Sequence, residues 1–234
     1  MNKTQQLYQD FRLIYGKLLL PHGFTFKNHS FYRRHADDVL LEVSIFSRVP
    51  YFDVIFEAHP FSFAYTDHKK GNGLGVDWFM ANRAKRIGQT YERQLHASYE
   101  SKMERIYHAF STEIFPEFNK VRSLDTYLSY QEWFISSVGQ IAGCCSVFWP
   151  LLQQKNYGAA YQYIQEYLAQ NASEYAEKVS MGNPSSPYVK NYELLRELAR
   201  KIDAQCYGEI DDCTQSRVMV TCDTCKRLGI LPES

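Results

Sequence analysis

The sequence has no excess of either charge and no long apolar run. Its 26 basic residues balance 26 acidic residues, so the formal net charge is zero. A neutral chain gives no reason to expect a nucleic-acid partner, because proteins that bind nucleic acids usually carry a basic surface. No apolar run approaches the ~20 residues needed to span a bilayer, and the polar segment Met1–Asp10 lacks the apolar core of a signal peptide. We therefore expect a cytoplasmic protein without a nucleic-acid or membrane partner.

The common catalytic signatures are also missing. The chain has no G-x-S-x-G nucleophile motif and no H-E-x-x-H zinc motif. The glycine-rich segment Gly71–Gly75 follows two lysines, but its spacing fits neither a P-loop nor a dinucleotide-binding turn, so we interpret it as a turn. Five of the seven histidines fall between His22 and His68, yet no two of them have the spacing of neighbours on one helix face or strand face. No catalytic arrangement is therefore predicted.

Aromatic residues are abundant, and many of them lie in one stretch, Phe24–Tyr65. The chain has 18 tyrosines and 15 phenylalanines, enough to fill a sizeable core. Within Tyr51–Ala58 apolar side chains alternate with mixed ones, which is the period of a half-buried strand. The connections are short and favour antiparallel neighbours. The pattern predicts strands over 24–26, 31–33, 40–46 and 51–58, with a fifth short strand over 61–65.

Helical periodicity occurs on both sides of this stretch. Apolar residues recur every three or four positions in Lys3–Leu20, and Pro21 follows directly. The same stripe runs over about six turns of Tyr91–Phe115, and Pro116 is expected to end that helix. We expect these two helices to cover one face of the sheet and to leave the other face to the C-terminal helices.

The pattern from Ser123 onward is helical. Ser123 is a predicted N-cap, Pro150 is expected to start a short helix, and Ser186 with Pro187 is expected to begin the last one. The predicted fold class is therefore α+β: an N-terminal helix, an antiparallel sheet of about four strands, a long amphipathic helix and an all-helical C-terminal half. We predict an α+β domain over 1–120, a helical bundle over 121–206 and a cysteine-containing tail over 207–234.

One stretch resembles a known family. The segment Leu20–Phe24 ends a helix and is followed by Lys27, then by Phe31-Tyr32-Arg33 and apolar strands. This order is similar to that of a bacterial domain-of-unknown-function family, number 4304, over about the first half of the chain. The resemblance implies a bacterial protein, and it supplies no activity and no catalytic residues.

Four of the six cysteines lie close to the C-terminus. Cys222 and Cys225 form a C-x-x-C pair, a spacing that can hold a zinc ion between two thiolates. Cys206 and Cys213 have six residues between them, which is looser than the usual second pair. Three interpretations stay open: a zinc site formed by these four cysteines, a redox C-x-x-C preceded by a strand over 218–221, and free thiols.

The sequence favours a non-enzymatic binding or interaction module, of an accessory or immunity type, with a protein partner. Tyrosine, tryptophan and arginine are enriched at protein interfaces. The alternative is a small-ligand-binding protein or an enzyme whose pocket lies between the sheet and the C-terminal helices. The expected binding residues are Tyr32, Arg33, Arg34, Tyr51 and Trp78.

Overall fold

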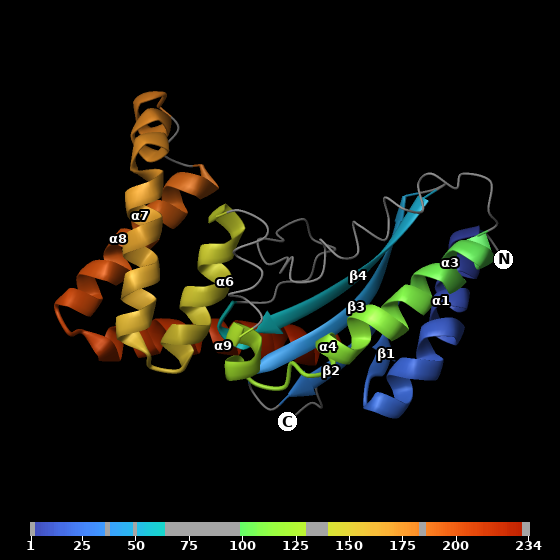
Figure 1. The fold of residues 1–234 in the computed structure, drawn as a ribbon. Coiled ribbons are helices and arrows are strands. Elements are labelled where there is room, and N and C mark those ends of the chain that lie inside the picture. The colour runs from blue at the N-terminus through green and yellow to red at the C-terminus, as the bar shows by residue number, and fades with distance from the viewer. Residues whose placement is uncertain are drawn as a thin grey trace.

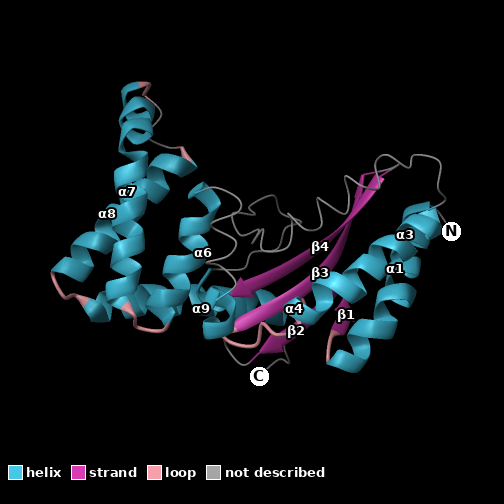
Figure 2. Cartoon of the chain, in the orientation of Figure 1, coloured by secondary structure: helices cyan, strands magenta, loops and turns pink. Residues whose placement is uncertain are grey.

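The computed structural model describes residues 3–35, 38–48, 51–63, 99–129, 140–182 and 186–230. A twisted antiparallel sheet lies at the middle of the described chain, with helices on both of its faces and a group of helices at one end (Figures 1 and 2). No described helix is both long and apolar enough to cross a membrane. The predicted α+β fold class is confirmed.

The sheet has four strands in the order β1-β2-β3-β4, and each neighbouring pair is antiparallel. The predicted fifth strand is wrong. Residues Phe61–Phe63 form a short 3-10 helix, η2, in which the Phe61 N–H donates to the Asp38 carbonyl at 2.9 Å. This bond joins the start of η2 to the residue before β3, next to the Val39–Pro60 pair. The strands are β1 Thr25–Lys27, β2 Ser30–His35, β3 Val39–Arg48 and β4 Tyr51–Pro60.

One face of the sheet is covered by α1 (Lys3–Leu19) and α3 (Tyr99–Ala109), which lie side by side (Figure 1). Their apolar stripes meet the alternate strand residues predicted to point inward. Phe56 of β4, for example, stacks on Phe110 with ring centroids 4.3 Å apart. This packing confirms that the two predicted helices cover the same face.

The second of these helices does not end at Pro116. After α3 the chain forms a π-helical turn, Phe110–Ile114, and then α4, Phe115–Phe118. The wider turn lets the Phe115 N–H bond to the Phe110 carbonyl, and it places Pro116 in the first turn of α4. A proline is tolerated there because the first N–H groups of a helix need no partner within it. The predicted residues 91–98 of this helix lie outside the described residues.

The other face of the sheet is covered by α9 (Tyr207–Arg227), the segment predicted as a tail. Val218 and Cys225 of α9 pack with Tyr32, Leu40 and Phe61 in a separate small core. The predicted strand over 218–221 is wrong, because these residues lie in the middle of this 21-residue helix.

A short helix over residues 124–129 follows α4. Further along the chain, one apolar core is shared by α6 (Gln140–Gln153), α7 (Tyr157–Ser180) and α8 (Pro187–Asp203). Pro150 lies inside α6 rather than at its start. An interior proline costs a helix about 3 kcal/mol. Burial of Phe148 and Trp149 in this core can offset that cost, since each large buried side chain contributes about 1.5–3 kcal/mol.

Two predicted helix caps are confirmed. The Ser123 hydroxyl accepts from the Thr126 N–H at 3.3 Å, and the Ser186 hydroxyl accepts from the Val189 N–H at 3.2 Å. Pro187 follows at the start of α8, as expected. The division of the chain at 120 and 206 stays a prediction.

Candidate functional site

The predicted binding residues on β2 point to opposite faces of the sheet. Tyr32 is buried in the small core beneath α9. Arg34, on the same face, is exposed and lies over the Phe61 ring, 5.7 Å from its centroid. Arg33 points to the face that carries α1 and α4, where Nη1 donates to the His22 carbonyl at 2.9 Å. The three consecutive residues therefore do not form one surface.

The other two predicted binding residues are Tyr51 and Trp78. Tyr51 is the first residue of β4 and pairs with Arg48 of β3. Trp78 lies outside the described residues, as does the glycine-rich segment Gly71–Gly75.

The four C-terminal cysteines all lie on or next to α9. Cys206 precedes the helix directly, and the other three are within it. Since a helix rises about 1.5 Å per residue, Cys206 and Cys225 lie almost the full length of α9 apart, about 30 Å. The four thiols therefore do not converge as a zinc site would require. The described residues contain no group of three or more histidine, cysteine or acidic side chains that could hold a metal ion.

A polar pair lies buried between the sheet and α9. The His59 Nε2 atom of β4 is 3.6 Å from the Glu42 Oε2 atom of β3, and both side chains are almost fully buried. Cys225 is close enough for Glu42 to affect its thiol electrostatically. A carboxylate, an imidazole and a thiol are the groups used in nucleophilic catalysis.

Burial argues against a nucleophilic role for Cys225. Its side chain is fully buried, and this burial, with smaller contributions from Cys222 and Glu42, raises the pKa of the thiol to about 12. The reactive form of cysteine is the thiolate, which such a pKa suppresses at neutral pH. We therefore interpret Cys225 and the buried pair as part of the contact between the sheet and α9.

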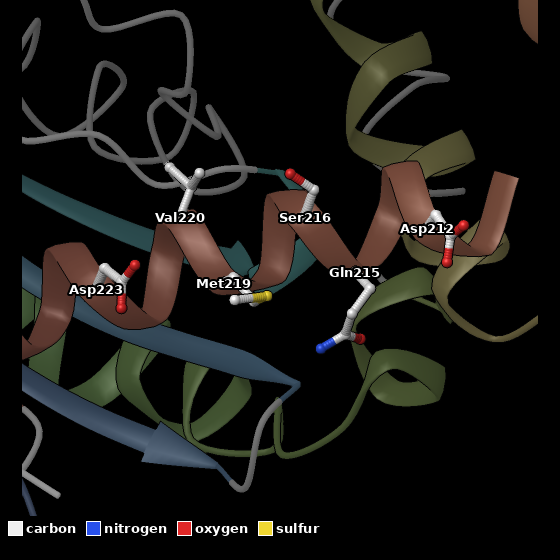
Figure 3. Close-up of a pocket in the computed structure, with 6 residues that line it drawn as sticks. All are labelled: Asp212, Gln215, Ser216, Met219, Val220 and Asp223. Atoms are coloured by element: carbon white, nitrogen blue, oxygen red, sulfur yellow. The ribbon is translucent and has the colours of Figure 1, made fainter. Parts of the chain in front are cut away.

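The opposite side of α9 faces outward and carries an open hollow of about 420 Å³. We call this surface the outer face of α9. Figure 3 shows Met219 and Val220 near the middle of the surface, with Asp212 and Asp223 toward its two ends. It is lined by Asp212, Gln215, Ser216, Met219, Val220 and Asp223.

The outer face combines exposed apolar groups with acidic groups. Met219 is 57% exposed and Val220 is 44% exposed, although both are large apolar side chains. Neither Asp212 nor Asp223 forms an ion pair with any residue in the described part of the chain. Adjacent exposed apolar residues that are bordered by charge are typical of an interaction surface.

The outer face was not found from the sequence. Val218, Met219 and Val220 are β-branched or apolar and therefore predict a strand rather than a helix. A helical interpretation would place Ile210, Val218 and Cys225 on one side and Met219 with Val220 on another. The sequence signal that indicates the outer face is therefore an apolar pair, Met219 and Val220, that lies outside the buried apolar stripe of the helix.

Comparisons with protein families, with curated proteins and with solved structures find no match.

Proposed function

We propose that this protein is a non-enzymatic interaction module, of the accessory or immunity type, that binds a protein partner through the outer face of α9. The observation that carries this proposal is the exposure of Met219 and Val220 within the hollow between Asp212 and Asp223. Because each side chain is about half exposed, burying the rest of it against a partner would contribute on the order of 1 kcal/mol each. Association would therefore remove an exposed apolar pair from water.

The charges on the outer face define the partner's chemistry. Asp212 and Asp223 are about 16 Å apart along the helix, given its rise per residue. A complementary segment would carry an apolar side chain between two basic residues at a similar separation. An amphipathic helix with lysine or arginine three turns apart has this form.

A bacterial cytoplasm is the proposed setting. The four C-terminal cysteines are free thiols, which suits a reducing compartment. The similarity of the Leu20–Arg33 stretch to a bacterial family supports a bacterial origin.

The alternative of an enzyme or small-ligand-binding protein with a pocket between the sheet and the C-terminal helices has less support. Where α9 meets the sheet, Tyr32, Leu40, Phe61, Val218 and Cys225 pack against one another. The one thiol beside the buried acid and histidine is suppressed as a nucleophile by its raised pKa.

The proposal is tested by site-specific crosslinking in bacterial cells. A photoreactive amino acid at Gln215, which lines the hollow, is expected to give a discrete adduct heavier than the 27.4 kDa chain. The adducted partner is then purified, and its Kd is measured. Replacing both Met219 and Val220 by Asp should weaken binding at least about tenfold, because the two apolar side chains together contribute about 2 kcal/mol.

Leu13→Asp is the matched control, because Leu13 is 59% exposed on the distant helix α1. It should leave both the adduct and the Kd unchanged. The proposal is contradicted if no adduct forms, if the adduct contains only two copies of this chain, or if the control weakens binding as much as the double variant.

A further inference from the structure

A second group of residues, at the end of β2, has unusual electrostatics. Arg33 and His35 are alternate residues of this strand and therefore point to the same face. Nη1 of Arg33 donates to the His22 carbonyl at 2.9 Å and to the Asn119 side-chain oxygen at 2.6 Å. The guanidinium also lies 4.6 Å from the centre of the Phe24 ring. These contacts hold Arg33 in one position between β2 and the turn after α4.

The other edge of the same guanidinium has no partner. Nε and Nη2 of Arg33 are buried and make no hydrogen bond with any described residue, and the same is true of Nε2 of His35. A buried charged donor without a partner is costly, because it has lost its water without replacement. Nε and Nη2 form the side edge of the guanidinium, whose two parallel N–H groups match two oxygens of one oxyanion.

A second arginine adds positive charge. The Nε atom of Arg122 donates to the Asn119 backbone carbonyl at 3.3 Å, so Asn119 contacts both arginines. Neither Arg33 nor Arg122 forms an ion pair with a described residue. Glu117 in α4 pairs instead with Lys120, at 2.8 Å. Among the described residues, therefore, no carboxylate forms an ion pair with either arginine.

The titration of these groups reflects this environment. Burial, together with the charge of Arg122, lowers the pKa of Arg33 to about 10. Burial lowers the pKa of His35 to about 4, and the charges of Arg33 and Arg122 contribute to this shift. An anion placed between Arg33, His35 and Arg122 would act in the opposite direction, because its negative charge raises the pKa of both Arg33 and His35.

We propose that Arg33, His35 and Arg122 form a binding site for a phosphate group, with the Nε–Nη2 edge of Arg33 holding two of its oxygens. Arg122 is exposed, in contrast to the buried Nε and Nη2 atoms of Arg33. Two arginines suit a phosphate dianion better than a carboxylate, since a single guanidinium already offsets one negative charge. The site is separate from the outer face of α9, and either proposal can fail without the other.

The test is titration of the full chain with inorganic phosphate at constant ionic strength, followed by calorimetry and by the NMR signal of the His35 ring. Saturable binding of one phosphate is expected, with the His35 titration midpoint moving to higher pH when phosphate is bound. Arg122→Gln should weaken binding about fivefold, which corresponds to the loss of a single exposed charge contact. Arg105→Gln, at an exposed position of α3, is the control and should have no effect.

A second variant tests the guanidinium geometry. Arg33→Lys keeps the charge but removes the two-pronged edge, so binding should weaken about tenfold or more while circular dichroism shows an intact fold. The proposal is overturned if phosphate gives no saturable binding, if Arg105→Gln weakens binding as much as Arg122→Gln, or if Arg33→Lys binds normally. Acetate that binds as tightly as phosphate would also overturn the phosphate assignment.

Discussion

Single residues in this protein depart from their ordinary chemistry where helices meet the sheet. Cys225 belongs to a C-x-x-C pair, a spacing used for metals and for redox work, yet its place beneath α9 leaves the thiol fully buried. Arg33 was predicted as a surface binding residue, yet it lies half-buried between β2 and the turn after α4. Residue type alone does not determine the role of either side chain.

The raised pKa of Cys225 makes the free energy of unfolding depend on pH in the alkaline range. The thiol titrates at about 12 in the folded protein and at about 9 in an unfolded chain, so between these values only the unfolded state loses the proton. The free energy of unfolding should therefore fall as pH rises from about 9 to about 12, with a slope of up to about 1.4 kcal/mol per pH unit.

Urea denaturation at a series of pH values measures this slope. Cys225→Ala should remove this contribution to the slope, although it also lowers stability at every pH by opening a small cavity. Cys206→Ala, at a partly exposed position before α9, should keep the slope. An unchanged slope in Cys225→Ala would show that the thiol does not titrate in this range.

Local signals determine how reliably each element can be predicted. The strands and α1 were recognised because their apolar residues follow one period without interruption. Ser186 and Pro187 marked the start of α8 because a hydroxyl cap and a proline have a defined place in the first turn of a helix.

The features that the sequence did not predict depend on tertiary contacts. Three buried residues of α9 are threonines, which a pattern analysis places outside a helical core. The Thr221 hydroxyl donates to the Phe61 carbonyl at 2.8 Å, a contact between segments 160 residues apart. Arg122 could not be assigned to a site with Arg33 for the same reason, because only the fold brings the two together.

The cap of α8 gives a direct prediction for that element. Ser186→Ala removes the oxygen that accepts from the Val189 N–H, so the free energy of unfolding should fall by about 1 kcal/mol. Ser186→Asp keeps an acceptor at the N-cap and should retain most of the stability. Thermal and urea unfolding of both variants check this, and equal losses in both would contradict a capping role.

At the scale of the whole molecule, α9 connects the sheet to the helical half. Arg217 of α9 donates to the Ser62 carbonyl at 2.8 Å, and its guanidinium lies 4.1 Å from the centre of the Trp149 ring in α6. The inner side of the helix is therefore occupied by structural contacts with both parts. The outer face carries none of these structural contacts.

The most direct test of this account compares two valines on the two sides of α9. Val218 is 7% exposed and Val220 is 44% exposed, and each is replaced by Gln in the purified protein. Val218→Gln should lower the free energy of unfolding by about 2–4 kcal/mol, because it places a polar group in an apolar core. Val220→Gln should change it by less than about 0.5 kcal/mol. A loss in Val220→Gln as large as that in Val218→Gln would contradict the account, because it would show that the outer face is part of the fold rather than a surface available to a partner.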